Sequence, residues 1–122
     1  MAALTILDTN IVIYFLEGRL AEPLPSGDLG VSIISDIELL SHTALDQAAE
    51  TVIRGFLSSV DTVDVTAPIK DAAIFLRRKH RLTIPDAIIA ATASTTDAEL
   101  LTNDAKLAGL TGIKTRSLAL KV

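Results

Sequence analysis

LTILDTN, residues 4–10, is an apolar run of strand length that ends abruptly on an acid, Asp8. Bounded β-branched runs of this kind suit a strand that is covered on both faces, and residues 11–16 are typical of a covering helix. Asp8 would then lie at the carboxyl end of the strand, which is the edge where open α/β sheets bind their ligands. The stretch therefore predicts a central strand that presents an acid at a functional edge.

Strand and helix patterns alternate along the rest of the chain. Further strands are expected at residues 29–34, 61–66, 99–102 and 113–118. Helices are expected from Ser35 onward, over residues 45–57, from near Pro68 to the basic run 77–81, from Thr83 through Ala93, and over residues 103–108. Such alternation indicates βαβ crossovers. We therefore predict an α/β three-layer sandwich with a mostly parallel central sheet, forming a single domain over residues 1–122.

The composition restricts the class of protein. A chain of 122 residues with 49% apolar and 3% aromatic content builds an aliphatic core and offers no aromatic platform for stacking bases. The absence of Cys excludes disulfides, thiolate metal sites and Cys nucleophiles. No signal-peptide pattern is present, and no apolar run approaches the roughly 20 residues that span a bilayer. We therefore expect a soluble, cytoplasmic protein without a membrane segment, and a mean hydropathy of +0.46 favours a buried partner surface.

The charges are unevenly distributed. Eleven basic and fifteen acidic side chains give a net charge of −4, which is the wrong sign for simple phosphate binding. The one concentrated basic run is Arg77-Arg78-Lys79-His80-Arg81. It either contacts an anionic partner or is a solvated helix end, since basic residues also suit a helix C-terminus.

Four acids stand out by position: Asp8, Glu38, Asp86 and Asp104. Each could simply cap a helix, Glu38 in a capping box with Ser35 and Asp86 in one with Thr83. However, three of the four follow predicted strands and would share one edge of a parallel sheet. Carboxylates about 4 Å apart repel by roughly 1–4 kcal/mol per pair, so such a cluster needs compensating cations.

A divalent metal ion is the economical compensation, because Lys106 is the only basic residue close in sequence to these acids. Mg²⁺ and Mn²⁺ prefer carboxylate and water oxygens, and a chain with two His and no Cys offers few other ligands. A metal held in this way lowers the pKa of bound water and stabilises charge on a phosphate, which suits phosphodiester hydrolysis. Neither His42 nor His80 has a recognisable nucleophilic Ser partner, and no glycine-rich phosphate loop occurs.

At these residues the sequence resembles the PIN-domain ribonucleases, specifically the small VapC-type toxins of toxin–antitoxin pairs. Four segments carry the resemblance in order: LDTNIVIYFLEG (7–18), SIISDIELL (32–40), LRRKHRLTIPDAIIAATA (76–93) and LLTNDAKL (100–107). The resemblance implies a PIN-like fold. By matching position, it implies that Mg²⁺ or Mn²⁺ is held by Asp8, Glu38, Asp86 and Asp104. The supporting polar groups would be Asn10, Ser35, Thr102 and Asn103.

The same resemblance implies endonucleolytic cleavage of RNA by a metal-activated water. It also implies a small VapB-type antitoxin that inserts a segment into a groove of the toxin, and a homodimer. The residues that would contact RNA phosphates or an acidic antitoxin tail are Arg77, Arg78, Lys79 and Arg81. Two alternatives remain open: a PIN nuclease of housekeeping RNA processing, and a module of the same fold that binds RNA or protein without cutting.

Overall fold

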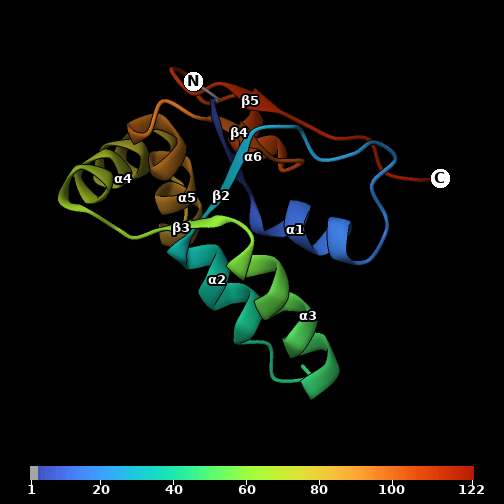
Figure 1. The fold of residues 1–122 in the computed structure, drawn as a ribbon. Helices are drawn as coiled ribbons and strands as arrows, with labels where there is room; N and C mark the ends of the chain where they lie inside the picture. Colours follow the sequence, from blue (N-terminus) through green and yellow to red (C-terminus); the bar gives the residue numbers. More distant parts are fainter. Residues whose placement is uncertain (1–2) are drawn as a thin grey trace.

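The computed structural model describes residues 3–122, so the first two residues of the predicted domain lie outside the described residues (Figure 1). The strands are β1 (Leu4–Leu7), β2 (Asp28–Ser32), β3 (Asp61–Val63), β4 (Glu99–Leu101) and β5 (Thr115–Arg116). The helices are α1 (Thr9–Leu16), α2 (Ile33–Leu40), α3 (Gln47–Ser58), α4 (Ala67–His80), α5 (Ile84–Thr95) and α6 (Ala105–Ala108). Within this part of the chain, no helix has both the length and the apolar character needed to cross a bilayer.

The five strands form one sheet in the order β3-β2-β1-β4-β5, and every pairing between them is parallel. β1 lies in the middle, where Ile6 is in register with Gly30 on one side and Leu100 on the other. Because the strands are parallel, their carboxyl ends meet at one edge of the sheet. The predicted α/β class, the parallel sheet and the central place of β1 are confirmed.

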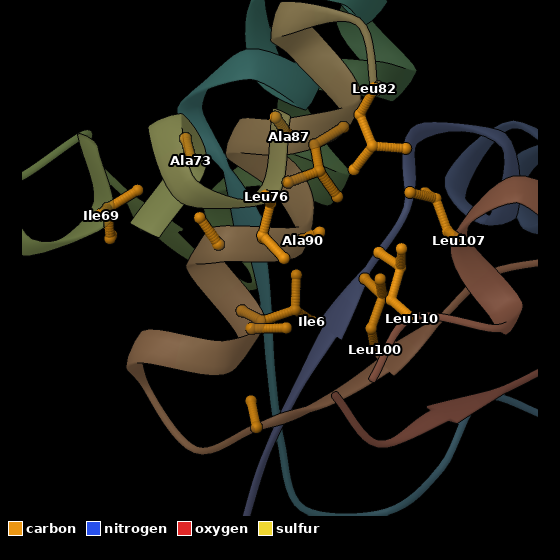
Figure 2. Close-up of a cluster of buried hydrophobic side chains, with 14 residues drawn as sticks. Ile6, Ile69, Ala73, Leu76, Leu82, Ala87, Ala90, Leu100, Leu107 and Leu110 are labelled. Atoms are coloured by element: carbon orange, nitrogen blue, oxygen red, sulfur yellow. The ribbon is translucent and has the colours of Figure 1, made fainter. Parts of the chain in front are cut away.

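Helices cover both faces of the sheet, so successive residues of a central strand enter different cores. Ile6 and Leu100 pack into the core beneath α4 and α5, where Leu76 and Ala90 are among their neighbours (Figure 2). Leu7 and the next residue of β4 enter the core beneath α1, α2 and α3, on the other side (Figure 1). This is the three-layer arrangement that the apolar runs predicted.

The start of α2 differs from the prediction. The helix begins at Ile33, and its N-cap is Ser32, whose hydroxyl accepts a hydrogen bond from the Ile34 amide at 3.1 Å. The predicted strand over residues 29–34 therefore ends two residues early, and the predicted capping box between Ser35 and Glu38 is wrong. Ser35 lies inside the helix. The side chains of Ser35 and Glu38 do not cap α2 but contact α1, as described below. The apolar Ile33 and Ile34 look like strand residues in the sequence, but they form the first turn of α2.

Two edge strands are shorter than predicted. β3 ends at Val63 rather than at residue 66, because Thr66 is already the N-cap of α4. β5 consists of Thr115 and Arg116 alone, not of residues 113–118. Strands at the edge of a sheet pair on one side only, so fewer ladder hydrogen bonds hold their ends in place.

Candidate functional site

The carboxyl ends of β1 and β4 bring two polar side chains together at the centre of the sheet edge. Asp8 follows β1, and its backbone amide donates to the Leu101 carbonyl of β4 at 2.9 Å. Thr102 follows β4, and its hydroxyl donates to Asp8 Oδ2 at 2.7 Å. Asp8 is 6% exposed and Thr102 only 1%. The edge therefore holds a buried carboxylate whose orientation is fixed by the neighbouring strand.

Asp8 is also the N-cap of α1, because its Oδ1 accepts a hydrogen bond from the Thr9 amide at 2.8 Å. Burial raises the pKa of the Asp8 carboxyl above its ordinary value. The hydrogen bonds from Thr102 and Thr9 lower this pKa, while the negative charges of Asp86 and Asp104 raise it further. No Lys, Arg or His in residues 3–122 forms an ion pair with Asp8. The carboxylate is thus buried beside other acids without a cation.

Asp86 and Asp104 come to the same edge from two other elements. Asp104 is the N-cap of α6, accepting from the Lys106 amide at 2.8 Å, and its own amide donates to the Thr102 hydroxyl at 3.0 Å. Asp86 lies in the first turn of α5, where Thr83 caps the helix by accepting from the Asp86 amide. The Lys106 ammonium is 3.8 Å from Asp86 Oδ2, and its side chain is two-thirds exposed. The structure therefore brings three of the four predicted acids together around β1.

Glu38 reaches the site by a different route. It is exposed on α2, and its Oε1 accepts a hydrogen bond from the Thr9 hydroxyl at 2.7 Å. The same hydroxyl lies 2.7 Å from Ser35 Oγ. Thr9 was missed as a site residue in the sequence, since its partners lie 26 and 29 positions away and no local pattern indicates them. The only available signal was its place directly after Asp8 in the LTILDTN stretch.

The predicted supporting residues fall into three groups. Thr102 contacts Asp8 directly, and the fully buried Ser35 contacts Thr9. Asn103 uses both ends of its amide on the backbone of Leu118, donating to the carbonyl and accepting from the amide at 2.9 Å each. Its described contacts therefore anchor the C-terminal segment. Asn10 is exposed on α1.

The donor chemistry of this edge fits a hard divalent cation, because carboxylate and hydroxyl oxygens are the available groups. A cation beside Asp8 would also offset the burial and the repulsion that disfavour its charged form. The described residues contain no ready-made group of three acidic or His side chains close enough to hold an ion. The fit is thus one of chemistry, with the acids gathered at one edge but not drawn into a closed cage.

The basic run forms the last turn of α4 and the turn into α5. Arg77 donates from Nε to the Leu82 carbonyl at 3.0 Å, and Arg81 ends the helix in the left-handed conformation, with φ of 56°. The Lys79 ammonium lies 5.7 Å from the centre of the Phe75 ring. The predicted contact residues Arg77, Arg78, Lys79 and Arg81 are all exposed. The run ends five residues before Asp86, at the turn that leads into α5.

Two apolar surfaces flank these groups. A groove of about 530 Å³ between α1, α2 and α3 is lined mainly by Ile13, Leu16, Leu39, Leu45, Val52 and Ile53, and Glu38 lies on its wall. A second surface, the α4–α5 patch, consists of the exposed side chains Val65, Ile74 and Ile84, which border one shallow pocket, together with the exposed Phe75, the next residue along α4. Exposed apolar surface of this extent is typical of proteins that bind partners.

Comparisons with known proteins agree with the fold. The family model described as PIN domain matches residues 5–112. A chain of a toxin–antitoxin complex from Klebsiella pneumoniae is 30% identical, covers 89% of this chain and 94% of its own length, and has a TM-score of 0.77. A chain of Rickettsia felis VapBC2, solved with promoter DNA, is 20% identical over 95% and 99% of the two chains, with a TM-score of 0.80. A chain of DNA-bound VapBC from Salmonella typhimurium is 21% identical, covers 96% of this chain and 98% of its own length, and has a TM-score of 0.79. A search of curated protein sequences gave no match.

Proposed function

The chain belongs to the PIN-domain family, and from that premise we propose that it is a Mg²⁺- or Mn²⁺-dependent endoribonuclease, the cytoplasmic toxin of a toxin–antitoxin pair. The observation that carries the proposal is the buried Asp8 carboxylate, which Thr102 orients and which has Asp86 and Asp104 as its charged neighbours. Burying an acid beside two others is costly unless a cation joins them. A housekeeping role would need no antitoxin, and the 30% identical chain comes from a toxin–antitoxin complex.

In the proposed reaction, Asp8, Asp86, Asp104 and Glu38 would hold the metal. A bound divalent ion would lower the pKa of water and offset the charge that develops on the phosphate. Thr102 keeps Asp8 oriented by its hydrogen bond to Oδ2. Glu38 accepts a hydrogen bond from the Thr9 hydroxyl on Oε1, which leaves Oε2 for the metal or for a water molecule.

The cations of the basic run, which precedes Asp86 in the chain, bind the RNA backbone. Arg77, Arg78, Lys79 and Arg81 are exposed and attract phosphates that the net charge of −4 would otherwise repel. The exposed Lys106 ammonium, next to Asp86, offers a further contact to the phosphate under attack. With no aromatic platform in the composition, recognition rests on the backbone rather than on stacked bases.

The two apolar surfaces receive the protein partners. A VapB-type antitoxin lays an apolar segment into the groove between α1, α2 and α3, and so approaches Glu38 on the groove wall. The α4–α5 patch joins two copies of the chain into a homodimer, since Phe75 and Ile84 are 60% and 56% exposed. Both roles would bury the surfaces that the mean hydropathy led us to expect.

The direct test is cleavage of a panel of RNAs by the purified protein with Mn²⁺, with Mg²⁺ and with EDTA. We expect internal cuts with either metal, none with EDTA, and none from Asp8→Asn or Asp86→Asn. Asp46→Asn is the matched control, because Asp46 caps α3 on an exposed surface and is remote in role from the acidic edge. Cleavage by Asp8→Asn at the wild-type rate would contradict the mechanism.

Binding of RNA without any metal-dependent product would instead favour the non-cleaving module. Growth arrest on expression, relieved by a small neighbouring reading frame, separates a toxin from a housekeeping nuclease. Metal-dependent cleavage in vitro without any effect on growth would contradict the toxin role but not the proposed cleavage mechanism.

A further inference from the structure

Three side chains from two helices meet where α1 begins. Thr9 is the first residue of α1, and its hydroxyl oxygen is 2.7 Å from both Ser35 Oγ and Glu38 Oε1 on α2. Ser35 is fully buried, whereas Glu38 is exposed. The Thr9 hydroxyl thus lies between a buried hydroxyl and an exposed carboxylate.

The hydrogen bonds that link these three side chains can point in only one direction. An ionised carboxylate only accepts hydrogen bonds, so Thr9 donates its single hydroxyl proton to Glu38. The Thr9 oxygen is then an acceptor toward Ser35, which must be the donor. The order is Ser35 to Thr9 to Glu38, and hydrogen bonds in such a chain polarise and strengthen one another.

This chain of hydrogen bonds connects the exposed acid Glu38 to the residue that follows the buried acid Asp8. Glu38 has a long side chain on an exposed helix surface, and the Thr9 hydroxyl is its described hydrogen-bond partner. Thr9 directly follows Asp8 in the chain, and Asp8 is held by Thr102 and by the cap of α1. The position of Glu38 is therefore set relative to Asp8 through one intervening residue.

We propose that Thr9 is a positioning residue, whose hydroxyl, oriented by Ser35, holds Glu38 in place relative to Asp8 for metal binding and for the attacking water. This role rests on the proposed function of the acidic edge. The competing interpretation is that the hydroxyl only fastens α1 to α2. A hydroxyl that only joins α1 to α2 affects stability alone, whereas a positioning residue affects metal affinity and turnover in protein that remains folded.

The test compares Thr9→Val, which removes the hydroxyl at nearly constant shape, with Thr9→Ser, which keeps it. Thr51→Val is the matched control, because Thr51 donates to the Gln47 carbonyl on the exposed face of α3. Mn²⁺ affinity is measured by calorimetry without RNA, melting temperature in EDTA, and kcat and KM on a cleaved RNA. Groups that orient metal ligands are typically worth about 10- to 100-fold. We expect Thr9→Val to lose at least about tenfold in Mn²⁺ affinity and in kcat, with KM changed by less than about threefold.

Thr9→Ser and Thr51→Val should both remain close to wild type in Mn²⁺ affinity and kcat. Ser35→Ala, which removes the donor behind Thr9, should show a smaller loss in the same direction and serves as the second variant if Thr9→Val does not fold. If Thr9→Val lowers the melting temperature but leaves Mn²⁺ affinity and kcat unchanged, the positioning role is overturned, and the hydroxyl only joins α1 to α2.

The calorimetric arm separates this inference from the function on which it rests. Mn²⁺ binding that Glu38→Gln weakens and Thr9→Val does not would overturn the positioning role alone. A wild-type protein that binds no Mn²⁺ would overturn the proposed function and the positioning role together. Mn²⁺ binding that depends on the Thr9 hydroxyl, in a protein that cleaves no RNA, would support the positioning role and contradict only the nuclease.

Discussion

Asp8 is a carboxylate that the fold buries at the end of its central strand without pairing it to a cation within the described residues. Its two oxygens accept hydrogen bonds from Thr9 and Thr102, yet burial and the charges of Asp86 and Asp104 still raise its pKa. The charged side chain therefore opposes folding at neutral pH in the absence of metal. Stability and function make opposite demands on this residue.

Asp8→Asn should stabilise the metal-free protein at pH 7 while lowering activity more than about 100-fold, because metal-held charge stabilisation is worth several kcal/mol. The folded pKa of Asp8 lies above its ordinary value of 3.8, so the folded carboxyl holds its proton more tightly than the unfolded one. The destabilisation is complete above the folded pKa and absent below the unfolded one. Thermal melts in EDTA should accordingly show the gain at pH 7 and its loss as the pH falls below about 4.

Asp46→Asn is the control for capping, because Asp46 accepts from the Ala49 amide at 2.8 Å on an exposed surface. Asn caps helices about as well as Asp, so this substitution should change the melting temperature little. A fall in stability for Asp8→Asn in EDTA would show that its hydrogen bonds outweigh its burial.

Metal itself should stabilise the wild type, since an ion that binds only the folded state adds about 2.7 kcal/mol at a hundred times its Kd. We expect Mn²⁺ to raise the melting temperature of the wild type and to do so much less for Asp8→Asn or Asp104→Asn. Differential scanning fluorimetry with and without EDTA measures both. Equal shifts in wild type and variants would contradict the assignment of these acids as ligands.

Single residues show how far sequence patterns reach into the site. Asp8 and Asp104 could be predicted because each ends an apolar run and starts a helix. Thr102 was predicted as supporting, and it contacts Asp8. Thr9 was missed, because its role depends on α2 packing beside α1, and contacts between helices leave no trace in a local pattern.

At the scale of elements, two chain reversals use a left-handed residue that is not glycine. Arg81 ends α4 with φ of 56°, and Asp97 follows α5 with φ of 54°. This conformation costs an L-residue about 1–2 kcal/mol. Glycine avoids that cost but loses more backbone entropy on folding, so the net gain in stability from a glycine is smaller. The Arg81 side chain is exposed at this position and is one of the predicted RNA-contact residues, whereas Asp97 is not.

Arg81→Gly should therefore stabilise the protein by about 0.5–1 kcal/mol and weaken RNA binding. Losing one phosphate contact should reduce the slope of log K against log salt by about one. Urea unfolding measures the first effect, and binding to a non-cleaved RNA at several salt concentrations measures the second. Asp97→Gly is the matched control: it should give a similar gain in stability with no change in salt slope. An unchanged slope for Arg81→Gly would remove Arg81 from the RNA contact.

The boundaries of elements were predicted less well than their types. The strand before α2 was drawn two residues too long, because Ile33 and Ile34 are apolar in either structure and the capping Ser32 competes with Ser35 as a helix start. The long, strongly periodic α3 was placed to within two residues at its start and one at its end. Where a local pattern fits two structures, tertiary packing decides between them.

At the scale of the whole molecule, two apolar surfaces are available for two different partners. Phe75→Glu, on the α4–α5 patch, should convert the proposed homodimer into a monomer, because a buried unpaired charge at an interface is costly. Light scattering after size exclusion measures this. Val52→Glu, in the groove between α1, α2 and α3, should leave the dimer intact and weaken antitoxin binding instead. If Phe75→Glu leaves the molar mass unchanged, the α4–α5 patch is not the dimer interface.

The class of the fold was predictable from the alternation of patterns, and so was the central place of β1. The order of the strands was not, since it depends on which distant segments pair: residue 6 is in register with residues 30 and 100. The approach of Asp104 to Asp8 follows from that order, because β4 lies beside β1, whereas Asp86 and Glu38 are carried by α5 and α2. The acids could thus be identified from the sequence, but their proximity depends on how distant segments pair and pack.

The central place of β1 also bears on how the chain is synthesised. β1 is synthesised before the other four described strands and can pair with β2 once residue 32 has emerged, but its other side has no partner until residues 99–101 follow. Thr102 and Asp104 come directly after that last partner. A growing chain therefore lacks the complete acidic edge until residue 104 has emerged, so the site cannot assemble on a nascent chain that carries only β1, β2 and β3.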